Sequence, residues 1–235
     1  MTQRSPGVPG MTIRVPPLGS STGPGRLAAA VCGLLGPVLL VVYFAAPAVT
    51  AWPYAGASPH RLLTYANSHA GLFYAGAWFQ ATGTLLSVVF FLALLQAAGA
   101  QSTFWGHLLL VAATSLLALV LVEAAFLIAV PQAAQAGDES SVATSFALSN
   151  GVFARVFPLA PASGSYIALG AVILGSAVLP RAFGLTAIVL GLAFEIAGLT
   201  AIFSSIGLFG AIGLSVLQVV WIVAAAATFG LRRPR

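Results

Sequence analysis

The sequence predicts an all-α polytopic membrane bundle of about six transmembrane helices, with two short interfacial helices. Of its 235 residues, 60% are hydrophobic and only 6% are charged, whereas a soluble domain carries about 25% charged residues. The apolar residues fall into six long runs, and a helix needs about 20 consecutive apolar residues to span a bilayer. These runs use most of the chain, so no room remains for a sizeable soluble domain.

The two ends of the chain differ from its centre. Residues 1–26 are rich in Pro, Gly, Ser and Thr and lack apolar periodicity, which is typical of a disordered tail. Met11 is an alternative start within it. Residues 27–231 form the predicted transmembrane domain, and residues 232–235 are a short basic end.

The first apolar run, 27–51, ends in Val49-Thr50-Ala51, which resembles a signal-peptidase site. The run is longer than the roughly 7–15 apolar residues of a signal peptide, so we favour a retained helix over a cleaved one. Ser58 then precedes Pro59, the pattern of a helix cap followed by proline at the first helical position. The first interfacial helix is therefore predicted at 59–67.

Five further spans follow along the chain. We predict them at 70–98, 104–130, 152–179, 182–204 and 207–231. The link between the second and third spans is short, which predicts an antiparallel pair. Asp138, in the polar segment before the fourth span, is expected to cap the second interfacial helix. Pro158 and Pro161 are expected to disturb the start of the fourth span.

The arginines predict the orientation in the membrane. With a cytoplasmic N-terminus, only Arg61 and Arg155 lie on the outer side. The inner set is Arg4, Arg14, Arg26, Arg181, Arg232, Arg233 and Arg235. Basic residues concentrate on the cytoplasmic side, so both termini are predicted in the cytoplasm, with the spans in the inner membrane of a bacterial cell. The net charge of +5 is scattered, so no nucleic-acid-binding face is predicted.

Motifs for catalysis and cofactor binding are missing from the sequence. It has no Gly-rich phosphate loop, no nucleophile elbow and no cysteine pair, since Cys32 is its one cysteine. In the predicted topology His60 and His69 lie on the outer side, whereas His107 lies on the inner side. We therefore predict no cofactor and no metal site.

Glu195 is the first of two acids inside apolar spans. A charged group at the bilayer centre costs about 2.5–3.5 kcal/mol on insertion scales, so such a residue is a candidate functional residue. Gly184, Gly191 and Gly198 recur every seven residues, and Glu195 lies on the same helix face. Small residues allow close helix packing in lipid, so Glu195 is expected to face the bundle interior.

Glu123, in the third span, is the second candidate. It is predicted in the outer half of the membrane, at a depth that Arg155 can reach. We therefore predict a charge pair between them, and Gln218 in the sixth span is another candidate polar partner. The alternative for both acids is a purely structural link between helices, worth about 0.6 kcal/mol on average.

Two stretches carry a resemblance to a known family. They are His69-Ala70-Gly71-Leu72-Phe73-Tyr74-Ala75-Gly76-Ala77-Trp78-Phe79-Gln80 and Leu179-Pro180-Arg181-Ala182-Phe183-Gly184-Leu185. Both resemble the bacterial multi-helix membrane proteins catalogued as domain of unknown function 4386, over roughly residues 27–230. The resemblance implies the fold and supplies no catalytic residues.

Three functions remain open from the sequence. The first is a non-enzymatic bundle that binds membrane lipid or a partner protein. The second is a membrane-embedded enzyme that uses Glu195 or Glu123 on a lipid-soluble substrate such as an isoprenoid, since a neutral acid can donate a proton. The third is a proton-coupled transporter with an intramembrane carboxylate, against which the six spans and the lack of a clear inverted repeat count.

Overall fold

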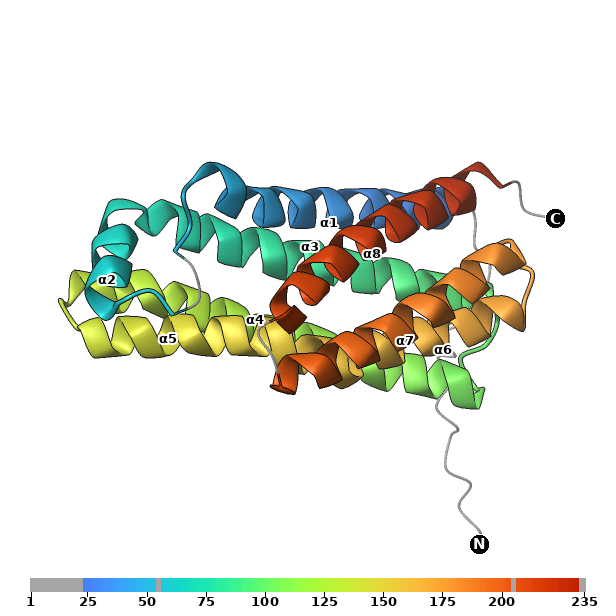
Figure 1. Ribbon diagram of the computed structural model, residues 1–235. Helices are drawn as coiled ribbons and strands as arrows, with labels where there is room; N and C mark the ends of the chain where they lie inside the picture. The colour runs from blue at the N-terminus through green and yellow to red at the C-terminus, as the bar shows by residue number, and fades with distance from the viewer. Residues whose placement is uncertain (1–22, 54–55, 204–205, 233–235) are drawn as a thin grey trace, which may run out of the picture.

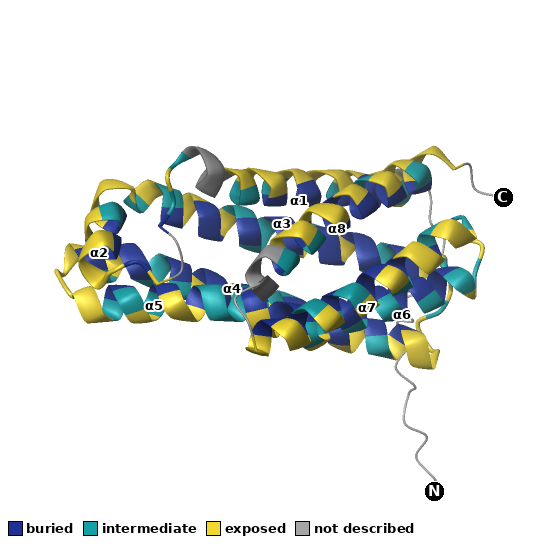
Figure 2. Cartoon of the chain, in the orientation of Figure 1, coloured by how far each residue is buried: buried dark blue, intermediate teal, exposed yellow. Residues whose placement is uncertain are grey.

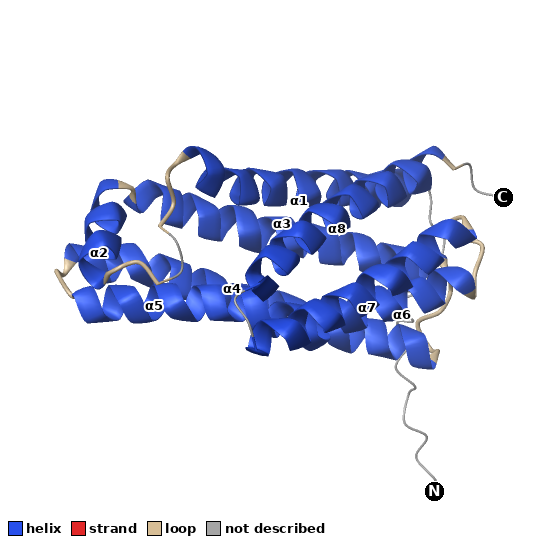
Figure 3. Ribbon diagram, in the orientation of Figure 1, coloured by secondary structure: helices blue, strands red, loops and turns tan. Residues whose placement is uncertain are grey.

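The computed structural model describes residues 23–53, 56–203 and 206–232, and these are helical with short connections and no strand (Figures 1 and 3). The predicted tail and basic end lie mostly outside the described residues. The elements are α1 (Gly23–Val49), α2 (Pro59–Ser68), α3 (Ala70–Ala97), α4 (Phe104–Gln135), α5 (Glu139–Gly151), the π-helical segments η1 (Val152–Val156) and η2 (Pro158–Ala162), α6 (Ser163–Leu174), α7 (Arg181–Phe203) and α8 (Ile206–Leu231).

Six helical stretches among the described residues are long and apolar enough to cross a membrane. They are α1, α3, α4, the continuous path from α5 to α6, α7 and α8. The predicted all-α membrane bundle is therefore confirmed. α1 begins at Gly23, ahead of the predicted boundary at residue 27, and α4 continues past its predicted end to Gln135.

The fourth span departs from its prediction. Glu139–Leu174 forms one helical path of 36 residues, so α5 continues directly into the fourth span and is not a separate short helix. Pro158 and Pro161 lie in its π-helical part. A proline lacks an N–H and its ring clashes with the carbonyl one turn earlier, and the wider π turn relieves this conflict. The prolines therefore disturb the middle of the span.

Local capping signals place α2 and α5 as expected. The Ser58 hydroxyl accepts a hydrogen bond from the Arg61 backbone N–H, and Pro59 opens α2. Asp138 caps α5 and accepts from the Ser141 backbone N–H at 3.0 Å. Both predicted caps are confirmed, because a cap depends only on residues within one helical turn.

The helices pack as antiparallel neighbours, with α1 beside α3 and α6 beside α7, while α8 crosses the bundle at an angle (Figure 1). α1 is an integral part of the bundle, since Arg26 Nε donates to the Phe229 carbonyl of α8 at 2.7 Å. Buried residues line the faces between helices (Figure 2). Large apolar side chains such as Val189 and Ile196 lie exposed on the outside, where lipid can cover them.

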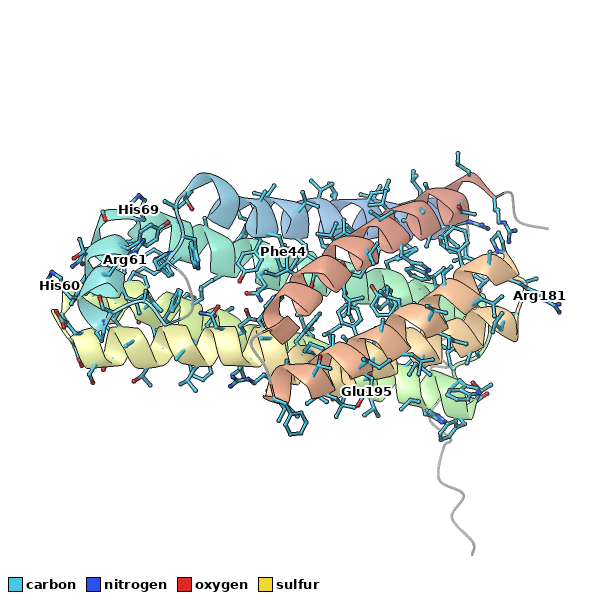
Figure 4. All side chains as sticks on the ribbon, viewed as in Figure 1. Phe44, His60, Arg61, His69, Arg181 and Glu195 are labelled. Atoms are coloured by element: carbon cyan, nitrogen blue, oxygen red, sulfur yellow. The ribbon has the colours of Figure 1, made fainter. Side chains whose placement is uncertain are left out.

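The two ends of the bundle carry different residues. Figure 4 shows Arg181 at one end, and His60 and Arg61 at the other. Arg232 joins the first end, where it donates to the carbonyls of Ala177 and Val178. This grouping fits the predicted orientation. Which end faces the cytoplasm stays a prediction.

Candidate functional site

Glu123 lies deep in the bundle, where polar side chains from three helices meet. It extends from α4 and is only 1% exposed. The Tyr43 hydroxyl of α1 donates to Glu123 Oε1 at 3.5 Å, and the Gln80 side chain of α3 interacts with the same carboxyl group. We call these three residues the Glu123 site.

Hydrogen bonding within the Glu123 site is incomplete. Glu123 Oε2 and Gln80 Oε1 are both buried and have no hydrogen-bond partner among the described residues. The contact from Tyr43 is longer than the 2.5–3.0 Å usual for O–H···O bonds, so it is weak. A buried polar atom without a partner costs about 1–3 kcal/mol. A hydrogen-bond donor placed beside these two oxygens would therefore stabilise the site.

A close approach of α1 and α3 holds Tyr43 and Gln80 in place. A Cβ on Gly36 would lie 2.7 Å from the carbonyl oxygen of Gly83, so the two backbones touch there. Gly83 is one helical turn from Gln80, on the same face of α3. Gly76, one turn before Gln80, leaves room for the Tyr43 ring, which lies 3.4 Å from its ideal Cβ position. Glycines on both sides of Gln80 thus allow the polar residues to meet.

Glu195 lies at a different seam, between α6 and α7 (Figure 4). The glycine face of α7 packs closely on its neighbour, as predicted: a Cβ on Gly191 would lie 2.8 Å from the Ser163 carbonyl oxygen. Glu195 itself is half-buried at the edge of this seam. Its Oε2 lies 2.6 Å from Ser163 Oγ, which also lies 2.9 Å from the Leu159 carbonyl oxygen.

Ser163 cannot serve both neighbours as a donor, because a hydroxyl carries a single hydrogen. Either it donates to the Glu195 carboxylate, or the Glu195 carboxylic acid donates to it and Ser163 donates to Leu159. In both arrangements the Glu195 oxygen nearest α6 has a partner. Glu195 therefore links two helices, which distinguishes it from Glu123.

The predicted charge pair between Glu123 and Arg155 is wrong. Arg155 is in η1, and its Nε donates to the Ala201 carbonyl of α7 at 3.2 Å. Glu123 instead faces α1 and α3, so a shared depth does not bring the two side chains together. Gln218 is buried in α8 and hydrogen-bonds neither acid among the described contacts. The two acids thus have separate partners on separate helices.

Sequence reasoning missed Tyr43 and Gln80. Tyr43 is 80 positions from Glu123 along the chain, and an isolated tyrosine in an apolar run gives no signal of its own. Gln80 did carry one: Gly76, Gln80, Gly83 and Ser87 recur at helical spacing on α3 and are all buried. That stripe of small and polar residues marks the face toward α1.

A cluster of titratable side chains lies at the end of the bundle that carries α2. His60 Nδ1 and Glu139 Oε1 are 3.0 Å apart and join α2 to α5. Beside them, the hydroxyl and backbone N–H of Ser141 hold the pKa of Asp138 below its usual value. Exposed pairs of this kind contribute little to stability, so we assign them a local role in holding α2 against α5.

Comparison with known protein families, curated proteins and solved structures finds no match to this chain. The resemblance to domain of unknown function 4386 stays a prediction. We therefore infer function from the geometry of the Glu123 site.

Proposed function

We propose that this membrane protein binds a small molecule with hydrogen-bond donors inside the bundle, at the Glu123 site. The observation that carries the proposal is the pair of buried oxygens, Glu123 Oε2 and Gln80 Oε1, that lack partners. A donor from a bound molecule would satisfy both. The protein is then a non-enzymatic binding bundle of the inner membrane, with both termini in the cytoplasm as the arginine distribution favours.

Energetics support binding over a purely structural role for Glu123. A polar link between membrane helices contributes about 0.6 kcal/mol on average, whereas each unsatisfied buried polar atom costs about 1–3 kcal/mol. With two such atoms, the ionised site without a guest costs more than a link contributes. Glu195 does not carry this cost at Oε2, because that oxygen is hydrogen-bonded to Ser163 Oγ.

The alternative functions share this binding step. An enzyme with a membrane-buried acid and a proton-coupled transporter both need a guest molecule at an intramembrane carboxyl group. Binding at Glu123 is thus the common requirement, and it can be tested before any turnover or transport is known.

The test uses purified protein in phosphatidylcholine nanodiscs and two small donor probes, n-butanol and n-butylamine. Ligand-observed NMR measures their binding to the wild type, to Glu123→Leu and to the matched control Glu195→Leu. We expect at least one probe to bind the wild type and the control, and binding to be lost in Glu123→Leu. Binding that is equal in all three proteins would refute the proposal. Melting temperatures of the variants report whether each is folded.

A further inference from the structure

The acceptor atoms of the Glu123 site specify the kind of donor that fits. Three oxygens are available to a guest: Glu123 Oε2 and Gln80 Oε1, which have no partner among the described residues, and Tyr43 Oη, whose lone pairs can accept. The carboxyl group also brings a negative charge when ionised. In the part of the chain that the structure describes, no Arg or His forms an ion pair with it. A complementary guest therefore carries about three donors and one positive charge.

We infer that the Glu123 site binds the primary ammonium group of a small amine in exchange for a proton. This inference rests on the proposed function and names its ligand class. A primary ammonium group has three N–H donors and one positive charge, which matches the three oxygens and the carboxylate. Its hydrogen bonds to a charged acceptor are also about twice as strong as neutral ones.

Other donors match the site less well. An alcohol has one O–H and a water molecule has two, and neither carries the charge that balances a carboxylate. A quaternary ammonium group has the charge but no N–H, so Glu123 Oε2 and Gln80 Oε1 would still lack hydrogen bonds. A guanidinium group has five N–H donors in a planar fork, which suits the edge of a single carboxylate better than oxygens on three different helices.

Without a bound amine, Glu123 can be neutralised by a proton. When Glu123 is protonated, the carboxyl group is neutral and supplies an O–H donor beside the Gln80 side chain, with which it already interacts. The groups that face the carboxyl are Tyr43 from α1 and Gln80 from α3, and neither supplies a positive charge. Proton and ammonium therefore exclude one another at this carboxyl group.

The exchange balances as one proton for one cation. A dissolved ammonium ion meets the Glu123 carboxylic acid, the acid releases its proton to water, and the ammonium forms an ion pair with the resulting carboxylate. No covalent bond other than O–H breaks, and the net charge of the site is zero before and after. Proton-linked transport of an amine requires such an exchange of one proton for one ammonium ion.

The experiment compares three probes that differ only in the head group: n-butylammonium, n-butanol and n-butyltrimethylammonium. Isothermal titration calorimetry in two buffers of different ionisation enthalpy counts the protons released by the protein in phosphatidylcholine nanodiscs. We expect n-butylammonium to bind most tightly, with about one proton released and up to about tenfold tighter binding per unit rise in pH. The other two probes are expected to bind about tenfold more weakly or not at all.

Three variants complete the design. Glu123→Gln keeps the shape and removes the charge, so it should lose n-butylammonium binding, whereas Glu195→Gln makes the same exchange at the other intramembrane acid and should keep it. Gln80→Leu removes one acceptor and should weaken n-butylammonium about tenfold. If Glu123→Gln fails to fold, Gln80→Leu still tests whether the ammonium group uses the acceptors of this site.

The outcomes separate the two proposals. If n-butanol binds as tightly as n-butylammonium, depends on Glu123 and releases no proton, the proposed function survives and the amine inference is overturned. If no probe shows binding that depends on Glu123 or Gln80, both are overturned. Tight binding of n-butyltrimethylammonium would show that charge alone selects the guest, which also contradicts the three-donor match.

Discussion

The α6–α7 seam predicts a measurable cost for one added methyl group. An ideal Cβ at Gly191 would lie 2.7 Å from Ile167 Cγ1, 2.8 Å from the Ser163 carbonyl oxygen and 3.0 Å from the Ile167 backbone nitrogen. Two of these three atoms belong to the backbone and cannot rotate away. Gly191→Ala must therefore push the two helices apart, and overpacking of this kind costs about 1–3 kcal/mol. The shift would also stretch the contact between Ser163 and Glu195.

The matched control for Gly191→Ala is Gly213→Ala in α8. An ideal Cβ at Gly213 meets nothing within 4 Å, so this variant only gains the higher helix propensity of alanine. Because both variants share that gain, the difference between them isolates the packing cost. At about 2–4 °C per kcal/mol for a protein of this size, Gly191→Ala should melt roughly 2–12 °C below Gly213→Ala. Intrinsic tryptophan fluorescence during heating in detergent measures both, and equal melting temperatures would refute the proposed close packing.

The remaining predictions address individual polar residues and the topology. Glu195→Gln should melt close to the wild type, because its amide can still hydrogen-bond Ser163; a large drop would argue for an ionised carboxylate. A double-mutant cycle of Glu123→Gln and Arg155→Gln should be additive within about 0.3–0.5 kcal/mol, since the structure separates them. The hydrogen bonds that lower the pKa of Asp138 stabilise the fold above its unfolded-state pKa. This contribution is lost as pH falls through the folded-state pKa, so Asp138→Ala should flatten the acid limb of a melting-temperature profile. A reporter active only outside the cytoplasm, fused to the C-terminus, should give no signal.

The sequence alone determined the properties that depend on residues close together in the chain. Hydropathy over about 20 residues located six spans, because lipid requires each spanning helix to be apolar along its whole length. The caps at Ser58 and Asp138 involve only the first turn of each helix. The glycine face of α7 followed from its seven-residue repeat, which helical geometry places on one side whatever lies opposite.

Only the tertiary structure decided which polar groups meet. The rotation of each helix about its axis and the identity of its neighbour determine whether Glu123 faces Tyr43 and Gln80 or Arg155, and neither quantity is encoded in a single span. Apolar packing between helices sets both, through contacts such as Gly36 against Gly83 between residues far apart in the chain. The same distinction explains α5: its sequence is polar enough for a separate interfacial helix, and only the tertiary structure shows that it continues through the π turns into the fourth span.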